Sequence, residues 1–203
     1  MADARPILRT VPEQLLGPRI LLRGFTDSDV EPLRKTVEDA LPHLQRWLPG
    51  FAQPWSTDDA VAFIRQHQAR WALRECFQFG IFQHDGSLVG NLRLRPTDWS
   101  IPAFDLAYWL HPAAEGHGYV SEAVRLAAKL AFDSLGAQRL VIVCDPKNER
   151  SRHIPERLGF IPEGCMRNSA RDAKNELMDL LVFALTPQDY ATASRSWTLG
   201  GDR

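Results

Sequence analysis

Two glycines, Gly116 and Gly118, place the tightest constraint on how this chain can fold. They separate an apolar stretch that ends at Leu110 from a segment in which apolar residues recur at helical spacing as far as Leu135, where Gly136 ends the pattern. A strand that passes through two glycines into a helix predicts an α/β unit with a tight turn. The N–H groups and the dipole at such a helix start can hold an anion, such as a diphosphate, without a lysine.

The Gly-x-Gly pattern is not specific by itself, because the same turn often serves only as a tight connection. Ser121 stands where the dinucleotide-binding fingerprint has its third glycine, and no Gly-Lys-Ser/Thr follows as in a Walker loop. A diphosphate cradle and a plain turn therefore both remain open at this stage.

The residues before the glycines predict two helices and four strands. A strand is expected at 19–23, and Thr26 with Asp29 begins a helix. The proline- and tryptophan-rich stretch 42–55 reads as a loop, and Ser56 with Asp59 caps a second helix that reaches Trp71. An antiparallel hairpin over 77–94, with its turn at 85–86, and a strand over 105–110 follow.

After the glycines, the uniformly apolar run Leu140–Cys144 predicts a central strand that is buried on both faces. A helix over 148–158, two strands over 160–167 and 177–185, and a short helical fragment near the C-terminus complete the pattern. The order predicts an α/β (α+β) fold with one mixed sheet and helices on both faces. We expect a single domain over 1–203, with about ten N-terminal and fifteen C-terminal residues peripheral.

Composition narrows the classes of function. The chain has 24 basic and 25 acidic residues, so no overall field favours nucleic acid or a membrane surface. Cys76, Cys144 and Cys165 have no paired spacing, which argues against disulfides or a zinc knuckle. No run approaches the roughly 20 apolar residues that span a bilayer, and no signal peptide is visible. A cytoplasmic protein is expected.

An ordered series of motifs carries more information than any one of them. It comprises Tyr108-Trp109-Leu110, Gly116 to Ala123, Asn148-Glu149-Arg150-Ser151, Glu156 to Phe160 and Glu163-Gly164, preceded by Leu44-x-x-Trp47-Leu48-Pro49. This series resembles the GNAT acetyltransferases, and more narrowly the RimJ/RimL-like branch that acetylates the N-termini of ribosomal proteins. The resemblance implies a mostly antiparallel, seven-stranded sheet that splays at strand 4.

The resemblance also implies the site. Acetyl-CoA is the expected co-substrate, with its pantetheine arm held by the backbone at Trp109 and Leu110, where the thioester carbonyl is also polarised. Asn148 is expected to bind that arm and Ser151 to protonate the leaving thiolate. The pyrophosphate is expected on the backbone of the segment Gly116, His117, Gly118, Tyr119, Val120 and Ser121.

The expected reaction is direct attack of a primary amine on the thioester in a ternary complex, with a protein N-terminus or a small amine as acceptor. No metal is required. The alternatives left open are a sensor that binds acyl-CoA without catalysis and another donor, such as succinyl-CoA. A homodimer is possible, because edge strands of such sheets often pair.

Two departures from the family pattern concern the loop. Glu115 replaces the Gln or Arg of the Q/R-x-x-G-x-G/A signature, and Val120 replaces its final Gly or Ala. A carboxylate near a diphosphate repels it unless the side chain points away, so weaker cofactor binding is expected. The general base is not assigned either: Ala170 falls where the branch has a glutamate, and Asp105, Glu163 or a water chain are left as candidates.

The remaining candidates each have a plainer explanation. His111, Glu115 and His117 lack the spacing of a metal site, and Cys144 is expected to be a packing residue. Trp47 is the residue proposed to line the acceptor site, with Trp55 and Trp71 less favoured. Three basic residues beside the Asn148 motif are either contacts for the 3′-phosphate of coenzyme A or a solvated helix start: Lys147, Arg150 and Arg152.

Overall fold

The computed structural model describes residues 5–172 and 174–197. Its sheet has eight strands in the order β1-β2-β3-β4-β5-β6-β8-β7. The strands are β1 (Gln14–Leu16), β2 (Ile20–Gly24), β3 (Phe77–Gln83), β4 (Leu88–Asp98), β5 (Ala103–Leu110), β6 (Arg139–Cys144), β7 (Ile161–Arg171) and β8 (Leu177–Leu185). The α-helices are α1 (Val30–Trp47), α2 (Thr57–Ala72), α3 (Tyr119–Lys129), α4 (Glu149–Arg157) and α5 (Pro187–Ala193).

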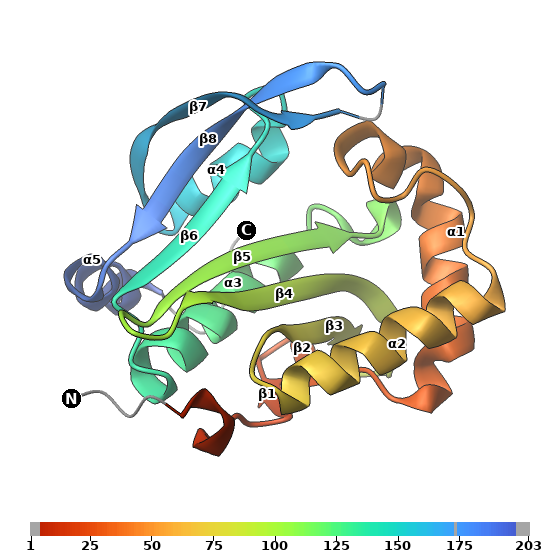
Figure 1. Cartoon of the computed structure of the whole chain (residues 1–203), viewed down its shortest axis with the longest axis horizontal. Helices are drawn as coiled ribbons and strands as arrows, with labels where there is room; N and C mark the ends of the chain where they lie inside the picture. The colour runs from red at the N-terminus through yellow and green to blue at the C-terminus, as the bar shows by residue number, and fades with distance from the viewer. Residues whose placement is uncertain (1–4, 173, 198–203) are drawn as a thin grey trace.

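The sheet opens between β5 and β6, its one parallel pair among the strands described. Their pairing runs from Ala103 to Leu106 on β5, yet β5 continues to Leu110 and β6 to Cys144. Figure 1 shows the two strands diverging beyond their paired part. The predicted splay is therefore present, and the strand at which it occurs is the fifth because β1 precedes it.

The count of seven strands was one too low. β1 is three residues long and pairs with β2, from Gln14 opposite Arg23 to Leu16 opposite Leu21. Alternation of apolar and polar residues cannot be recognised over three positions, so the strand leaves no clear sequence pattern.

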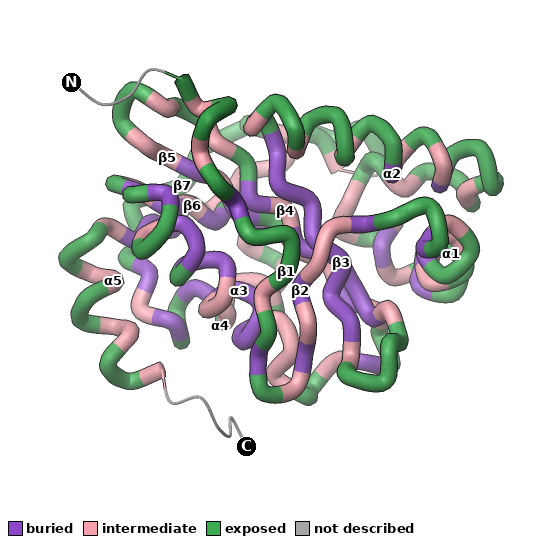
Figure 2. Tube along the Cα trace, turned by 90° about the horizontal axis from the view of Figure 1, so that it is seen from below, coloured by how far each residue is buried: buried purple, intermediate pink, exposed green. Residues whose placement is uncertain are grey.

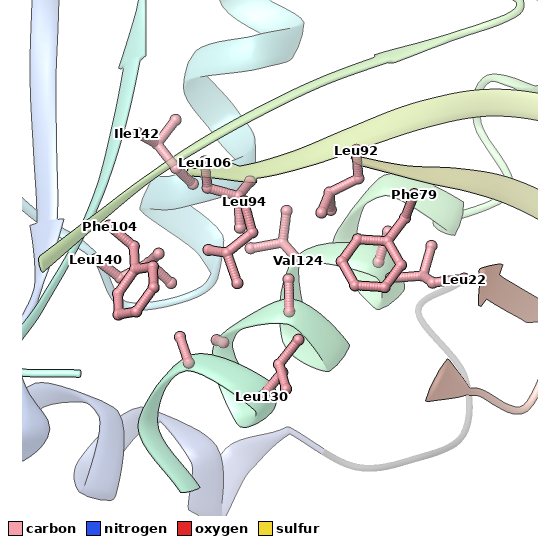
Figure 3. Packing of buried hydrophobic residues seen from close by; sticks show 14 of the residues in the cluster. Leu22, Phe79, Leu92, Leu94, Phe104, Leu106, Val124, Leu130, Leu140 and Ile142 are labelled. Atoms are coloured by element: carbon pink, nitrogen blue, oxygen red, sulfur yellow. The ribbon is translucent and has the colours of Figure 1, made fainter. Parts of the chain in front are cut away.

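The main core lies between the sheet and α3. Side chains that alternate along the strands, among them Phe79, Leu92 and Leu106, meet Val124 and Leu130 from the segment that follows the glycines, as Figure 3 shows. A second apolar cluster lies on the opposite face, beneath α1. Figure 2 shows buried positions along β3 and β4, whereas most of α2 is exposed. Helices thus cover both faces, as predicted.

The stretch 42–55 is not a loop throughout, because α1 continues to Trp47 with Pro42 inside it. Proline lacks the N–H that would bond the preceding turn, which disfavours a helix there. Leu44, two residues later, is 1% exposed and packs in the cluster beneath α1. We infer that this burial outweighs the missing hydrogen bond. The second helix begins as predicted, since Ser56 and Asp59 form a capping box.

The expectation that β6 is buried on both faces was wrong. Leu140, Ile142 and Cys144 are buried in the main core, but Val143 is 42% exposed. The described parts of α1 and α2 pack on β3 and β4 and leave this end of the sheet uncovered. The exposed face adjoins the opening beside β5.

The C-terminal segment packs more closely than a loose terminus would. Thr186 and Asp189 form a capping box at the start of α5, Tyr190 stacks on Phe132 with ring centroids 4.6 Å apart, and Trp197 packs against the main core. The expected tail beyond 197, like residues 1–4, lies outside the described residues. Among the helices described, none has the length and apolar character needed to cross a membrane.

Candidate active site at the opening of the sheet

The loop between β5 and α3 turns through its two glycines as the sequence predicts. Gly116 has φ = 80° and Gly118 has φ = 73°, in the left-handed region that favours glycine. Gly118 is also the residue that caps α3. A Cβ atom at Gly118 would lie 3.1 Å from the guanidinium of Arg19, so a side chain is disfavoured there by contact as well as by φ.

An ion pair between Glu122 and Arg19, which the sequence motifs did not reveal, holds this loop in place. The Glu122 carboxylate, 4% exposed, accepts hydrogen bonds from the backbone N–H groups of Arg19 and Ile20 and from Arg19 Nε at 2.7 Å. Arg19 Nη1 in turn donates to the carbonyl oxygen of His117 at 2.8 Å. Arg19 thus binds carbonyl groups of the loop from the side on which it lies. The first N–H groups of α3 have no acceptor within the helix.

The side chains of the loop are directed mainly to protein partners. His117 stacks on Tyr119, whose hydroxyl accepts a hydrogen bond from Gln83 Nε2 at 2.7 Å. Ser121 is fully buried and accepts a hydrogen bond from Arg157 of α4, and Val120 packs against the main core. Any role of this segment in binding a diphosphate therefore rests on its backbone.

A hollow of about 540 Å³ lies beside this loop, on its α1 side. His117 and Tyr119 line it together with Lys35 and Asp39 of α1. Ser151 and Trp109 are not among its lining residues.

Trp109 and Leu110 lie at the unpaired end of β5. On one edge they pair with Asn91 and Gly90 of β4, while pairing with β6 has already ended at Leu106. Gly90 permits this close approach, because a Cβ atom there would lie 2.4 Å from the carbonyl oxygen of Trp109. The free edge of β5 leaves backbone groups available to an extended ligand, as in strand addition.

Asn148 and Ser151 meet at the start of α4. Asn148 Oδ1 accepts a hydrogen bond from the N–H of Ser151 at 3.1 Å and so caps the helix. The Tyr108 hydroxyl on β5 donates to the carbonyl oxygen of Ser151 at 3.1 Å. Removal of its hydroxyl from water raises the pKa of Tyr108, so the hydroxyl stays protonated. This contact ties α4 to β5 across the opening of the sheet.

Glu115 does not carry an uncompensated charge. Its carboxylate pairs with Arg150 of α4 and lies 3.3 Å from His43 Nε2 of α1. Burial, and then the positive charges of Arg150 and Arg46, lower the pKa of His43, so Glu115 lies beside a neutral imidazole. The substitution that departs from the family pattern thus links α1 and α4 beside the opening.

Of the tryptophans singled out in the sequence, Trp55 is connected to Trp109 through the ring of Phe51. It stacks on Phe51 with centroids 5.5 Å apart, and Phe51 meets the Trp109 ring edge-on at 6.0 Å. Trp47 ends α1 under the Arg46 guanidinium, and Trp71 packs on Phe77 and Phe79. The ring contacts bring Phe51 and Trp55 to β5, and the placement of Trp47 at the acceptor site stays a prediction.

Both carboxylates considered as general bases are paired with arginine. Asp105 accepts hydrogen bonds from Arg95 and Arg93. Glu163 forms two hydrogen bonds with Arg139, which lower its pKa. Because its pKa is lowered, the Glu163 carboxylate is a weaker base. Ala170, opposite Met178 in the β7–β8 hairpin, offers no group in their place.

The residues weighed as metal ligands have other partners. His111 Nδ1 accepts a hydrogen bond from the N–H of Ala113, and the ring of His117 bonds the carbonyl oxygen of Ala114. Over 5–172 and 174–197, no three His, Cys, Asp or Glu side chains are grouped to hold a metal ion. Cys144 is buried, and burial raises the pKa of its thiol to about 11.

The basic residues near Asn148 differ in their surroundings. Arg150 pairs with Glu115, and Arg152 lies 3.3 Å from Glu156 along α4. Lys147 is exposed. These positions are compatible with a solvated helix start and do not test a contact with a phosphate.

Comparison with known proteins places the chain in a family. A model of the acetyltransferase (GNAT) domain matches residues 19–161. The protein named "Putative ribosomal N-acetyltransferase YdaF" of Bacillus subtilis (strain 168) is 30% identical over 86% of this chain and 95% of its own. The ribosomal-protein-serine acetyltransferase of Escherichia coli (strain K12) is 27% identical over 73% of this chain and 82% of its own.

The structural comparison agrees on the fold. The RimL ribosomal L7/L12 alpha-N-protein acetyltransferase in complex with coenzyme A superposes with a TM-score of 0.79 at 20% identity, over 87% of this chain and 97% of that one. This likeness concerns the fold alone. With the family match over most of its length, the chain belongs to the GNAT acetyltransferases, in their RimJ/RimL-like branch.

Proposed function

We propose that this acetyltransferase transfers an acetyl group from acetyl-CoA to the N-terminal α-amine of a protein. The observation that carries the proposal is the arrangement around the opening of the sheet. The free edge of β5 at Trp109 and Leu110, the start of α3 and Ser151 on α4 surround the same opening. Two of the relatives are ribosomal N-acetyltransferases by name, which favours a protein acceptor.

These residues fit the cofactor by their chemistry. An extended pantetheine arm can pair with the unpaired backbone edge of β5, and the N–H groups at the start of α3 suit a diphosphate. Glu115 is paired with Arg150, so its charge does not rule out a nearby phosphate. Coenzyme A supplies an activated thioester, which leaves this chain to orient the amine and to manage protons.

The reaction proceeds by attack of a neutral amine nitrogen on the thioester carbon. The C–N bond forms, the C–S bond breaks, and the leaving thiolate takes a proton from the hydroxyl of Ser151, which regains a proton from water. The backbone of Leu110 polarises the carbonyl oxygen as charge develops on it. The amine proton passes to water, because both candidate carboxylates are held by arginine.

The experiment measures thiol release from acetyl-CoA with peptides that begin in Ser, Ala or Met. Turnover only in the presence of a free N-terminus, and a fall of about 10²-fold or more in Ser151→Ala, support the proposal. Ser196→Ala, in the short turn after α5, serves as the matched control. Binding of acetyl-CoA without turnover across the peptides would instead favour a sensor, and faster turnover with succinyl-CoA would reassign the donor.

A further inference from the structure

Polar residues occupy the sheet face opposite α3, next to the unpaired end of β5. Asn91 of β4 stands opposite Trp109, and Arg93 stands opposite Ala107. Being two residues apart on one strand, Asn91 and Arg93 lie on the same face. Ala107 is exposed, at the place where pairing with β6 has ended. The patch formed by Gln78, Asn91, Arg93 and Asp105 is called the β4 patch below.

Two hydrogen-bond donors of the β4 patch have no acceptor. Gln78 Nε2 donates to Asn91 Oδ1, but Asn91 Nδ2 is buried without a partner, and the residue as a whole is 3% exposed. Arg93 Nε is also buried without a partner, and Arg93 Nη2 lies 3.4 Å from Asp105 Oδ1, which is long for a charged pair. Buried polar atoms normally have partners, and these two call for an oxygen acceptor from a ligand.

The charges of this face point to the same kind of ligand. Asp105 is shared between Arg93 and Arg95, which leaves the three groups with a net positive charge. Burial lowers the pKa of His67 on α2, and the charges of Arg70 and Arg93 lower it further against a hydrogen bond with the carbonyl oxygen of Phe63, so the neutral imidazole adds no charge to this face. Farther along the sheet, Arg139 is matched by Glu163. Of Arg93, Arg95 and Arg139, Arg93 therefore has the weakest ion pair.

We propose that the β4 patch binds a carboxylate carried by the amine acceptor, so that the enzyme selects acidic N-terminal sequences. This inference rests on the proposed function, since it places the acceptor amine at the end of β5. The face opposite α3 is the side from which the amine approaches, because α4 and the start of α3 occupy the other side of the opening.

The geometry limits which residue of the acceptor carries the charge. Arg93 lies two residues along β4 from Asn91, the residue that pairs with Trp109. At the usual rise of a strand, this is a distance of about 7 Å. An extended peptide covers about 3.5 Å per residue. A carboxylate on the second or third residue of the acceptor can therefore reach Arg93. An acceptor with several positive charges, such as a polyamine, would be repelled.

The test compares amidated tripeptides that differ at one side chain. Ser-Glu-Ala, Ser-Gln-Ala and Ser-Lys-Ala, and the same series with the change at the third residue, are assayed with acetyl-CoA. We expect kcat/KM for the preferred Glu peptide to exceed that for its Gln counterpart by about tenfold, mainly through KM, and Lys to be poorer still. Arg93→Gln should abolish the Glu preference, whereas Arg139→Gln, on the neutralised pair, should keep it.

Binding separates this inference from the proposed function. The same peptides are titrated by calorimetry into the protein loaded with coenzyme A, where no turnover is needed. Preferential binding of the Glu peptide that Arg93→Gln removes supports the β4 patch even if no peptide is acetylated. Equal turnover of the three peptides, or equal binding where turnover is absent, would overturn the inference while leaving acetylation itself to be judged by thiol release.

Discussion

Replacement of Glu122 by glutamine tests how the diphosphate loop is held. The carboxylate accepts three hydrogen bonds: from Arg19 Nε at 2.7 Å, from the Arg19 N–H at 2.9 Å and from the Ile20 N–H at 3.2 Å. A glutamine side chain can keep its oxygen on the two backbone donors, but its amide nitrogen then faces Arg19 Nε, a donor against a donor. The substitution therefore removes one charge-assisted bond and leaves a donor without an acceptor.

The magnitude follows from these contacts. A hydrogen bond to a charged group contributes about 1.5–3 kcal/mol, and the Arg19 side chain is 31% exposed, so water recovers part of the loss. We expect Glu122→Gln to lower the free energy of unfolding by roughly 2 kcal/mol. For a domain of this size, roughly 2 kcal/mol corresponds to a fall in Tm of about 4–8 °C.

The assay is thermal unfolding followed by circular dichroism, with Glu31→Gln as the control. Glu31 makes the same chemical pair with Arg34, but its side chain is 64% exposed, so no measurable fall in Tm is expected. Since Arg19 also bonds the carbonyl group of His117, Glu122→Gln should weaken coenzyme A binding as well. Equal Tm values for the two variants would refute the account of the loop.

Three further predictions concern the surroundings of the site. Glu115→Gln removes a negative charge beside the loop and releases Arg150 from its ion pair. Calorimetry should then show that coenzyme A binds several-fold more tightly. Weaker binding would mean that the ion pair organises the site. A thiol reagent at a pH of about 7.5 should label the exposed Cys165 rapidly, but Cys76 and Cys144 only when the protein unfolds. The reason is that burial raises the pKa of the Cys76 and Cys144 thiols to about 11. Mass spectrometry of the labelled peptides measures which cysteines have reacted. Burial lowers the pKa of His67, so the folded protein binds a proton on this imidazole less readily than the unfolded chain does. The free energy of unfolding should therefore fall as the pH drops below about 6.5. Urea unfolding at pH values of about 7.5 and 5.5 should show a smaller fall in His67→Gln than in the unchanged protein, and an equal fall would contradict this reasoning.

The sequence by itself determined the features that depend on neighbours along the chain. The left-handed glycines at 116 and 118 follow from the turn that joins a strand to a helix. The capping box of Ser56 with Asp59 and the hairpin around Gly86 involve residues only a few positions apart. The order of motifs also sufficed to place the chain in its family, since the spacing of the motifs is itself a property of the sequence.

Tertiary structure decided what depends on distant residues. Glu122 binds Arg19, 103 positions away, and the carboxylate of Glu115 meets Arg150 from another helix. No local pattern encodes such pairs. Pro42 stays inside α1 while Leu44 is buried beyond it, and Val143 is exposed because α1 and α2 pack on β4 and β3 and do not cover this face of β6. The unsatisfied donors at Asn91 and Arg93 likewise exist only because the sheet brings β4 and β5 together and burial removes water from them.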